Sequence, residues 1–151
     1  MADEPYELAL RALSYKERTE SELRAWLAER DVAEVEIEEV IALLMEAGAI
    51  DDASFARRYA EDKRALAGWG PDRISKALES RGVTRPHIES ALEGEDAEAQ
   101  LERAVGLLGD RGMVCADERE RERALSLLVR RGYPLELAYD AVRTVERPSR
   151  G

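Results

Sequence analysis

The chain has 151 residues, of which 37% are charged, 44% hydrophobic and only 5% aromatic. This balance argues against a β-sheet sandwich and favours amphipathic surface helices, so we expect an all-α fold. The single cysteine excludes a disulfide framework and a C-x-x-C metal pair, and the net charge of −10 argues against a protein that coats bare nucleic acid. The acidic start is unlike a secretory signal, and the longest apolar run, Val40 to Met45, is too short to span a bilayer. We therefore expect a soluble cytoplasmic protein.

The first predicted module covers residues 1–50 and contains three helices. A short helix over 5–13 comes first. A T-x-x-E capping-box pattern that starts at Thr19 then begins a second helix. A third helix is expected over about 33–47, where Gly48 supplies a left-handed stop.

The second predicted module covers residues 51–94. Its first helix begins at a cap formed by Asp51 or Asp52. This helix is expected to run to about residue 66, with three apolar side chains on one face: Phe55, Tyr59 and Leu66. The sequence G-W-G-P breaks it, and the proline is well placed as the first residue of the next helix, which ends at Gly82. A short helix over 86–92 completes the module.

The third predicted module covers residues 95–151 and begins near Asp96. A D-x-x-E pattern at Asp117 predicts a second capping box, and Pro134 opens a last helix that runs to about Val145. Both ends of the chain are expected to fray: Met1–Glu4 and the C-terminal tail, Pro148–Gly151.

A ten-residue pattern, L-x-x-x-L-x-x-R-(G/D)-(V/Y), occurs three times, with isoleucine and alanine in place of the first leucine in the second and third copies. The copies begin at Leu23, Ile74 and Ala124, at intervals of 51 and 50 residues. The same apolar stripe follows each copy. Such a period indicates stacked units, none of which buries its apolar face alone. We therefore predict three tandem three-helix modules in an elongated, curved array that acts as a binding surface. Asp31 stands where the other copies have glycine, a position that needs only a residue tolerating a left-handed conformation.

The sequence offers no residues suited to catalysis. Its one histidine, His87, and its one cysteine, Cys115, fall in different modules; we interpret the first as a solvated helix residue and the second as a small buried filler. The adjacent Asp51 and Asp52 could suggest acid–base or magnesium chemistry, but their position before a helix favours capping. The G-W-G-P segment lacks the lysine and hydroxyl residue of a phosphate loop. We predict no enzyme activity, no cofactor, no metal site and no small-molecule substrate.

Basic residues of the middle module are the strongest functional signal in the composition. The net charge is −8 over residues 1–50, +1 over 51–92 and −3 over 93–151. Seven cations are expected to flank the apolar faces of two helices and to form a cationic strip if these helices are neighbours: Arg57, Arg58, Lys63, Arg64, Arg73, Lys76 and Arg81. The alternative is a solvated face in which Arg57 and Arg58 pair with acids four residues on, which leaves the other five cations freer.

Trp69 and a second group of arginines are two further features to interpret. Trp69 could enter a partner's pocket or stack on a base, but its position relative to Ile74 favours a hydrophobic staple; we retain it as a candidate partner-binding residue. A second arginine cluster is interrupted by glutamates and is interpreted as a charged helix face: Arg119, Arg121, Arg123, Arg130 and Arg131.

Three segments of the chain resemble the RecX regulatory proteins of bacteria. These are L-S-Y-K-E-R-T-E-S-E-L-R-A-W-L from Leu13, L-M-E-A-G-A-I-D-D-A-S-F-A-R-R-Y-A-E-D-K-R from Leu44, and G-P-D-R-I-S-K-A-L-E-S-R-G-V from Gly70. The resemblance covers nearly the whole chain and is strongest in the middle module. It implies three tandem three-helix modules and a non-enzymatic regulator that binds the RecA filament on single-stranded DNA and restrains its ATPase and strand-exchange activities.

The resemblance implies a role in recombinational DNA repair. The charge of +1 over the middle third, between two acidic thirds, leads us to expect that the middle module's cations face the filament. We expect a monomer without a membrane partner, whose contact with single-stranded DNA would occur within the filament. The acidic total charge shifts weight from DNA to protein contacts. The alternatives are a helical module that binds DNA directly, and a generic helical-repeat scaffold for another protein partner.

Overall fold

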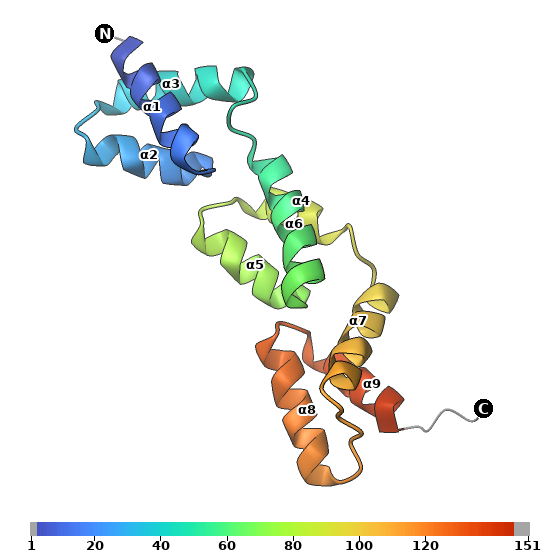
Figure 1. Cartoon of the computed structure of the whole chain (residues 1–151). Coiled ribbons are helices and arrows are strands. Elements are labelled where there is room, and N and C mark those ends of the chain that lie inside the picture. Colours follow the sequence, from blue (N-terminus) through green and yellow to red (C-terminus); the bar gives the residue numbers. More distant parts are fainter. Residues whose placement is uncertain (1–2, 147–151) are drawn as a thin grey trace. The chain divides into compact units, whose positions relative to one another are not determined.

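The computed structural model of the chain describes residues 3–146, and its regular elements over this range are all helices (Figure 1). In chain order they are α1 Asp3–Tyr15, α2 Glu20–Glu29, α3 Glu34–Glu46, α4 Asp52–Asp62, the π-helical segment η1 Lys63–Ala67, α5 Pro71–Ser80, α6 Arg85–Leu92, α7 Ala97–Asp110, α8 Glu118–Arg130 and α9 Leu135–Glu146. The all-α prediction is confirmed. None of these helices has the length and apolar character needed to cross a membrane.

The chain divides into two compact units. Unit 1 consists of the residues up to Ala56 together with Leu78–Glu89, and unit 2 consists of Arg57–Ala77 together with the residues from Ser90 onward. Helices α4, α5 and α6 each supply residues to both units. Because this division runs through the predicted middle module, the number of modules and their borders at 50 and 94 stay predictions.

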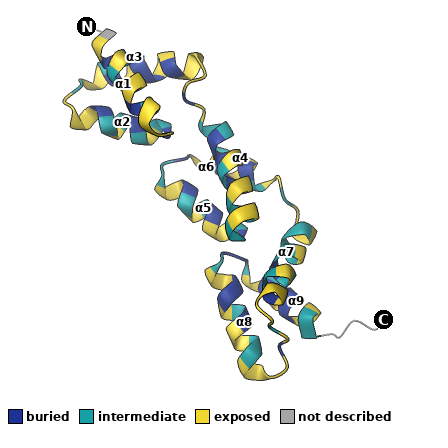
Figure 2. Ribbon diagram, viewed as in Figure 1, coloured by how far each residue is buried: buried dark blue, intermediate teal, exposed yellow. Residues whose placement is uncertain are grey.

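Unit 1 contains the packed helices α1, α2 and α3, with exposed and buried residues alternating at helical spacing (Figure 2). Its buried cluster consists of Ala9, Ala12, Leu23, Leu27, Ile37, Val40, Ile41, Leu44 and Ile50. Thr19 caps α2: its hydroxyl accepts a hydrogen bond from the Glu22 N–H, and the Glu22 carboxylate accepts one from the Thr19 N–H. The predicted capping box and the apolar stripe of α3 are therefore confirmed.

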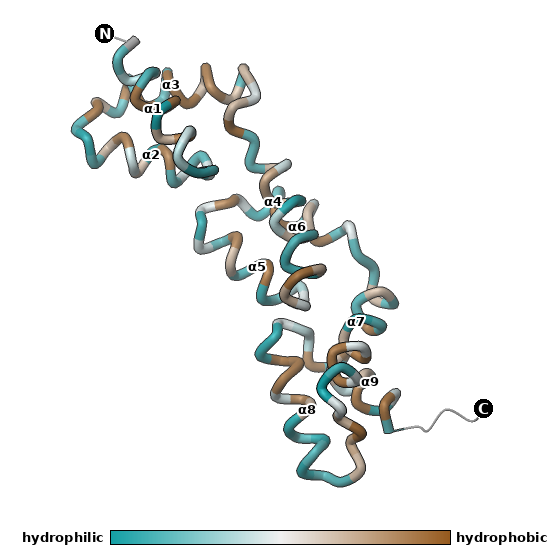
Figure 3. Tube along the Cα trace, in the orientation of Figure 1, coloured by the Kyte–Doolittle hydropathy of each residue, from teal (hydrophilic) through white to brown (hydrophobic). Residues whose placement is uncertain are grey.

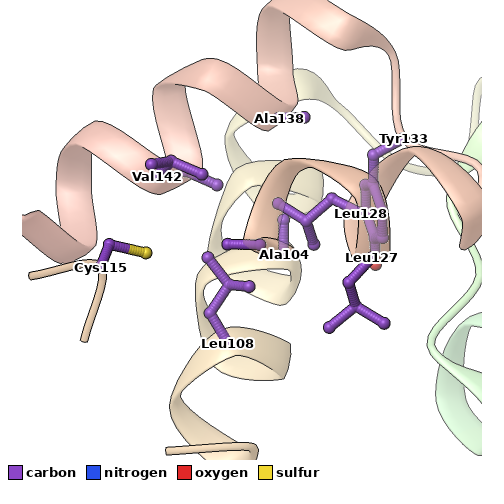
Figure 4. Close-up of a cluster of buried hydrophobic side chains, with 10 residues drawn as sticks. Ala104, Leu108, Cys115, Leu127, Leu128, Tyr133, Ala138 and Val142 are labelled. Atoms are coloured by element: carbon purple, nitrogen blue, oxygen red, sulfur yellow. The ribbon is translucent and has the colours of Figure 1, made fainter. Parts of the chain in front are cut away.

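Unit 2 contains α7, α8 and α9, whose apolar side chains meet in a second core (Figure 4). Its buried members are Ala104, Leu108, Cys115, Ala124, Leu127, Leu128, Tyr133, Ala138, Ala141 and Val142. Burial raises the pKa of the Cys115 thiol, which disfavours the reactive thiolate. The interpretation of Cys115 as a buried filler is therefore confirmed.

The repeated pattern marks equivalent buried positions in all three copies. Its two apolar positions are completely buried in each copy: Leu23 and Leu27, Ile74 and Leu78, and Ala124 and Leu128. The arginine that follows ends a helix each time, and the next residue has a left-handed backbone, with φ of +61° at Asp31, +83° at Gly82 and +98° at Gly132. The expectation that Asp31 adopts this conformation is confirmed.

Helix α4 begins as predicted but ends differently. Asp51 accepts a hydrogen bond from the Ser54 N–H and so provides the cap, whereas Asp52 accepts one from the Glu20 N–H. After Asp62 the α-helix changes into the π-helix η1, whose wider turns shift the register of the residues that follow. Leu66 is consequently 85% exposed, and its predicted place on the face of Phe55 is wrong.

Two smaller corrections concern helix ends. Helix α1 begins at Asp3, so the predicted fray of Met1–Glu4 is wrong for its last two residues, while the predicted tail Pro148–Gly151 lies outside the described residues. Asp117 caps α8 as predicted, but Glu120 accepts from the Ala116 N–H rather than from Asp117. The box is therefore only half formed.

In unit 1 the start of α2 meets the residues that follow α5. The buried Thr19 hydroxyl donates to the Arg81 carbonyl at 2.6 Å, and the Arg81 guanidinium binds the Glu22 carboxylate through two hydrogen bonds of 2.8 and 3.1 Å. A Cβ atom on Gly82 would lie 2.4 Å from Cβ of Ser21, so this position admits glycine alone without a shift. We name Thr19, Glu22, Arg81 and Gly82 the unit 1 junction.

In unit 2 the start of α5 meets the residues that follow α8. The Gly70 N–H donates to the Arg131 carbonyl at 2.8 Å, and the Asp72 N–H donates to the Gly132 carbonyl at 2.9 Å. A Cβ on Gly70 would lie 2.6 Å from the Gly132 oxygen, and one on Gly132 would lie 2.5 Å from the Arg73 nitrogen. We name Gly70, Asp72, Arg131 and Gly132 the unit 2 junction.

Both junctions occupy the same place in the repeat. In unit 1 a donor at the N-terminal end of α2 meets a carbonyl at the C-terminal end of α5. In unit 2 donors at the N-terminal end of α5 meet carbonyls at the C-terminal end of α8. Helix ends carry unpaired N–H and C=O groups of opposite partial charge. In unit 2 these groups pair directly, whereas in unit 1 the Thr19 hydroxyl accepts from the Glu22 N–H and donates to the Arg81 carbonyl. In the first copy the side chain of Asp31 is exposed. Glycine is therefore needed in the second and third copies but not in the first.

Candidate partner-binding surface

Trp69 lies beside two cations at the edge of unit 2. The guanidinium carbon of Arg73 is 4.2 Å from the centre of the indole ring, and the Lys63 ammonium is 4.7 Å from it. The Tyr59 ring meets the indole edge-on, with 6.4 Å between ring centres. The electron-rich face of an indole attracts cations, which holds all four side chains together. We name Tyr59, Lys63, Trp69 and Arg73 the Trp69 cluster.

The backbone around Trp69 is fixed from both sides. Its N–H donates to the Lys63 carbonyl at 3.1 Å, across the left-handed Gly68 that ends η1. Its carbonyl accepts a hydrogen bond of 2.9 Å from Arg103. Because the next residue, Gly70, belongs to the unit 2 junction, the ring is presented from a rigid turn. The predicted staple between Trp69 and Ile74 stays a prediction.

The side chain of Arg64 is largely buried and is held by partners in unit 2. Its guanidinium donates to the Ala91 carbonyl at 3.2 Å, near the end of α6, and lies 3.5 Å from the Glu95 carboxylate. Only 12% of its side chain is exposed, and burial, with the charge of Arg103 nearby, lowers its pKa. The expectation that Arg64 is freer of partners is wrong, because Glu95 comes back to it from 31 residues later in the chain.

Arg81 is likewise engaged, within unit 1. Besides Glu22 it contacts the Phe55 ring, with its guanidinium carbon 4.5 Å from the ring centre. Burial alone would raise the pKa of Glu22. Hydrogen bonds from Arg81 and Thr19, together with the positive charge of Arg81, hold this pKa below its usual value. The expectation that Arg81 is freer of partners is therefore also wrong, because its acidic partner lies 59 residues away in sequence.

The other predicted cations are exposed in unit 2. Arg57 and Arg58 follow one another on α4, and Lys76 lies one turn beyond Arg73 on α5. Arg73 is exposed as well, although its guanidinium also donates to the Arg130 carbonyl at 3.3 Å. Unit 2 thus carries six of the eight predicted site residues outside a buried ion pair: Arg57, Arg58, Lys63, Trp69, Arg73 and Lys76.

The structure adds a polar network that the sequence did not indicate. Arg103 pairs with Glu95 and donates to the Tyr133 hydroxyl at 2.9 Å, and that hydroxyl donates to the Gly68 carbonyl at 2.9 Å. Arg131 donates to the Ala67 carbonyl at 2.6 Å. These bonds support the turn that carries Trp69. Only the position of Tyr133, directly after the repeated R-G, hinted at a structural role.

Arginines of the second cluster are sorted by the structure into three environments. Arg121 pairs with Glu146 at 3.2 Å, and Arg131 supports the Trp69 turn. The other three, Arg119, Arg123 and Arg130, line one open groove together with Arg111. The interpretation as a charged helix face agrees with the exposure of Arg119, Arg123 and Arg130, but it is wrong for Arg131, whose guanidinium binds a backbone carbonyl. The spacing of 119, 123 and 130, which places all three on one side of a helix, was the signal that could have separated them.

His87 and Asp52, two residues with potential chemistry, belong to unit 1. His87 is half-buried beside a small unit 1 cavity of about 210 Å³ that Asp52 also lines, and burial raises the pKa of Asp52. Over the range 3–146, no group of three or more histidine, cysteine or acidic side chains is placed to hold a metal ion. The fold and surface define an all-helical protein in which cations surround an aromatic ring on unit 2.

The comparisons give this class a family. Residues 6–44 match the model of the first three-helix domain of RecX, and residues 51–92 match that of its second three-helix domain. "Regulatory protein RecX" of Mycolicibacterium vanbaalenii is 34% identical over 144 residues, which cover 89% of this chain and 78% of that protein. The chain belongs to the RecX family of regulatory proteins.

Solved structures agree with this assignment. The crystal structure of RecX from Lactobacillus salivarius superposes with a TM-score of 0.87 over 96% of both chains; at 24% identity this likeness concerns the fold. Another crystal structure, of regulatory protein RecX, has a TM-score of 0.80 at 27% identity, over 95% of this chain and 71% of the other. The relatives are named as regulators, and their names indicate no catalytic activity.

Proposed function

We propose that this protein binds the RecA recombinase filament on single-stranded DNA, in the cytoplasm, and restrains the filament's ATPase and strand-exchange activities. Membership of the RecX family carries the proposal. The segment 51–92, which matches the second three-helix domain of RecX, contains every residue of the candidate surface. One of the two segments that match the family therefore also carries the cations of this surface.

The proposed contact surface consists of four exposed cations of unit 2 and two half-buried side chains beside them: Arg57, Arg58, Arg73 and Lys76, with Lys63 and Trp69. A rigidly held tryptophan flanked by cations resembles the anchors that dominate protein interfaces, which are rich in tryptophan and arginine. Its charge suits acidic side chains of RecA, or phosphates reached within the filament. Arg64 and Arg81 contribute indirectly, by holding the elements that carry this surface.

The test is ATP hydrolysis by preformed RecA filaments on single-stranded DNA, to which the purified protein is added in increasing amounts. We expect a dose-dependent loss of turnover. Undiminished hydrolysis at saturating protein would contradict the proposal.

A parallel titration with naked DNA separates the main alternative. The net charge of −10 predicts weak binding, whereas a direct DNA-binding module would bind tightly at low salt with an affinity that falls steeply as salt rises. Tight, salt-sensitive binding to naked DNA without any effect on RecA would favour that alternative.

A further inference from the structure

An open groove of about 1040 Å³ runs along α8 in unit 2. Four arginines line it, against a single acid, Glu122. Of these, Arg111, Arg119 and Arg123 have no ion-pair partner within residues 3–146, and Arg130 bonds only a carbonyl of its own helix, that of Ser126, through its side chain. The groove therefore carries uncompensated positive charge in a protein whose total charge is strongly negative.

The same groove has apolar walls. Val129, Leu135 and Tyr139 line it and are 47%, 56% and 44% exposed, respectively. The first half of α8 is hydrophilic, in contrast to its second half (Figure 3). A surface that combines exposed apolar side chains with a rim of cations is typical of a site for an amphipathic, acidic helix.

Helix α3 of unit 1 has a matching outer face. The helix contains five glutamates and no basic residue, and its inner face, with Ile37 and Leu44, is buried. Its exposed residues recur at helical spacing along the opposite side: Val35, Glu38, Glu39, Ala42, Met45 and Glu46. Val35 is 71% exposed and Met45 50% exposed. Of the three glutamates on this side of α3, Glu38 already pairs with Arg24, which leaves Glu39 and Glu46 to meet another chain.

We propose that two copies of this protein associate by placing α3 of one copy in the arginine groove of the other. Val35, Ala42 and Met45 would cover the apolar walls, while Glu39 and Glu46 would meet the arginines. Each contact joins two different surfaces, so a copy that has donated its α3 still has a groove to offer. This association goes beyond the proposed action on RecA and replaces the monomer expected from sequence.

A nucleic acid fits the groove less well. Phosphates would satisfy the arginines, but they would leave Val129 and Leu135 against a charged backbone without apolar contact. An acidic helix satisfies both kinds of side chain, and the chain itself supplies one. The contact is expected to be weak and salt-sensitive, since exposed ion pairs are screened and contribute little individually.

The test is sedimentation equilibrium of the full chain, whose monomer mass is 16.9 kDa, at low and high salt. We expect association that rises with concentration and weakens at least about tenfold in Arg119→Glu/Arg123→Glu and in Glu39→Lys/Glu46→Lys. Mixing these two variants should restore it, because the intact groove of one fits the intact α3 of the other, and the two reversed surfaces also match in charge. Circular dichroism establishes that both variants remain helical.

A matched control has the same change in net charge as the groove variant but lies outside both surfaces. Arg11→Glu/Lys16→Glu reverses two exposed cations of unit 1 and should associate like the wild type. A wild-type chain that stays monomeric up to about 1 mM overturns the proposal. So does a mixture of the two reversed variants that stays monomeric, or a groove variant whose main loss is affinity for single-stranded DNA.

Discussion

The unit 1 and unit 2 junctions occupy the same place in the repeat but are made of different atoms. In unit 1, side chains form the contact: the Thr19 hydroxyl and the Glu22 carboxylate hold the carbonyl and guanidinium of Arg81. In unit 2, backbone N–H groups of Gly70 and Asp72 donate directly to carbonyls, at a distance that only glycine permits. A repeated sequence thus fixes one side of each contact, the R-G turn, and leaves the other side free to diverge.

This difference predicts how each junction breaks. Both junctions should exclude an added Cβ atom, on Gly82 in unit 1 and on Gly70 or Gly132 in unit 2, but the unit 2 junction should tolerate most side-chain changes around it. The unit 1 junction should depend on a hydroxyl and on the charge of one carboxylate, and therefore on pH.

We expect the largest effect from Gly132→Ala. A left-handed φ costs an ordinary residue about 1–2 kcal/mol, and forcing a Cβ to within 2.5 Å of a backbone nitrogen adds overpacking of about 1–3 kcal/mol. Gly112→Ala is the matched control, because its φ of +66° is also left-handed but no atom lies within 4 Å of the added Cβ. Urea unfolding should show a loss for Gly132→Ala at least twice that of the control; equal losses would mean that the close approach contributes nothing.

The next largest effect is expected from Thr19→Ala in unit 1. The change removes a helix cap, which costs about 1 kcal/mol, and a hydrogen bond to the Arg81 carbonyl in a buried setting, which costs a further ~1 kcal/mol. Thr19→Ser keeps the hydroxyl and should lose much less. Similar losses for both substitutions would show that packing of the methyl group, not the hydroxyl, is responsible.

A smaller, pH-dependent effect is expected at Glu22. Its pKa in the folded protein is below the usual value, so its carboxylate stabilises the fold above the pKa of the unfolded chain, about 4.3, and this contribution is lost as the pH falls through the lower folded pKa. Glu22→Gln should therefore be less stable than the wild type at pH 7, and the difference should vanish in acid. A difference that persists unchanged at pH 3 would contradict this role.

Much of the fold could be predicted because it depends on local pattern. The caps at Thr19, Asp51 and Asp117 and the buried stripes follow from residue type and spacing within single helices. The π-helix was missed, since no short-range pattern distinguishes η1 from a continuing α-helix, and Leu66 was misplaced as a result. Sequence periodicity identifies which residues share a face, but not where a helix changes its pitch.

The candidate site was only partly predictable, for a different physical reason. Whether a cation is exposed or paired depends on which elements meet across the fold. The partners of Arg64 and Arg81 lie 31 and 59 residues away and became visible only once the helices were packed. The identity of the protein partner came from family resemblance, which charge and periodicity could not supply.

The smallest effect is expected at Asp31, the first copy's counterpart of Gly82. Asp31→Gly relieves a left-handed φ that aspartate tolerates, but it adds freedom to the unfolded chain, so the stability should change by less than about 0.5 kcal/mol. The opposite exchange, Gly82→Asp, should be strongly destabilising, because its Cβ would meet Ser21. Comparable effects at the two positions would contradict the account of why glycine is absent from the first copy.

The central claim, that exposed cations of unit 2 act on the RecA filament, is tested most directly by one comparison of ATP hydrolysis. Preformed RecA filaments on single-stranded DNA are titrated with the wild-type protein, with Arg73→Glu/Lys76→Glu, and with Arg11→Glu/Lys16→Glu as a control of equal net charge. The account predicts that the wild type and the control reduce turnover equally and that the first variant, still folded by circular dichroism, requires at least about tenfold more protein. Equal inhibition by all three proteins would contradict it.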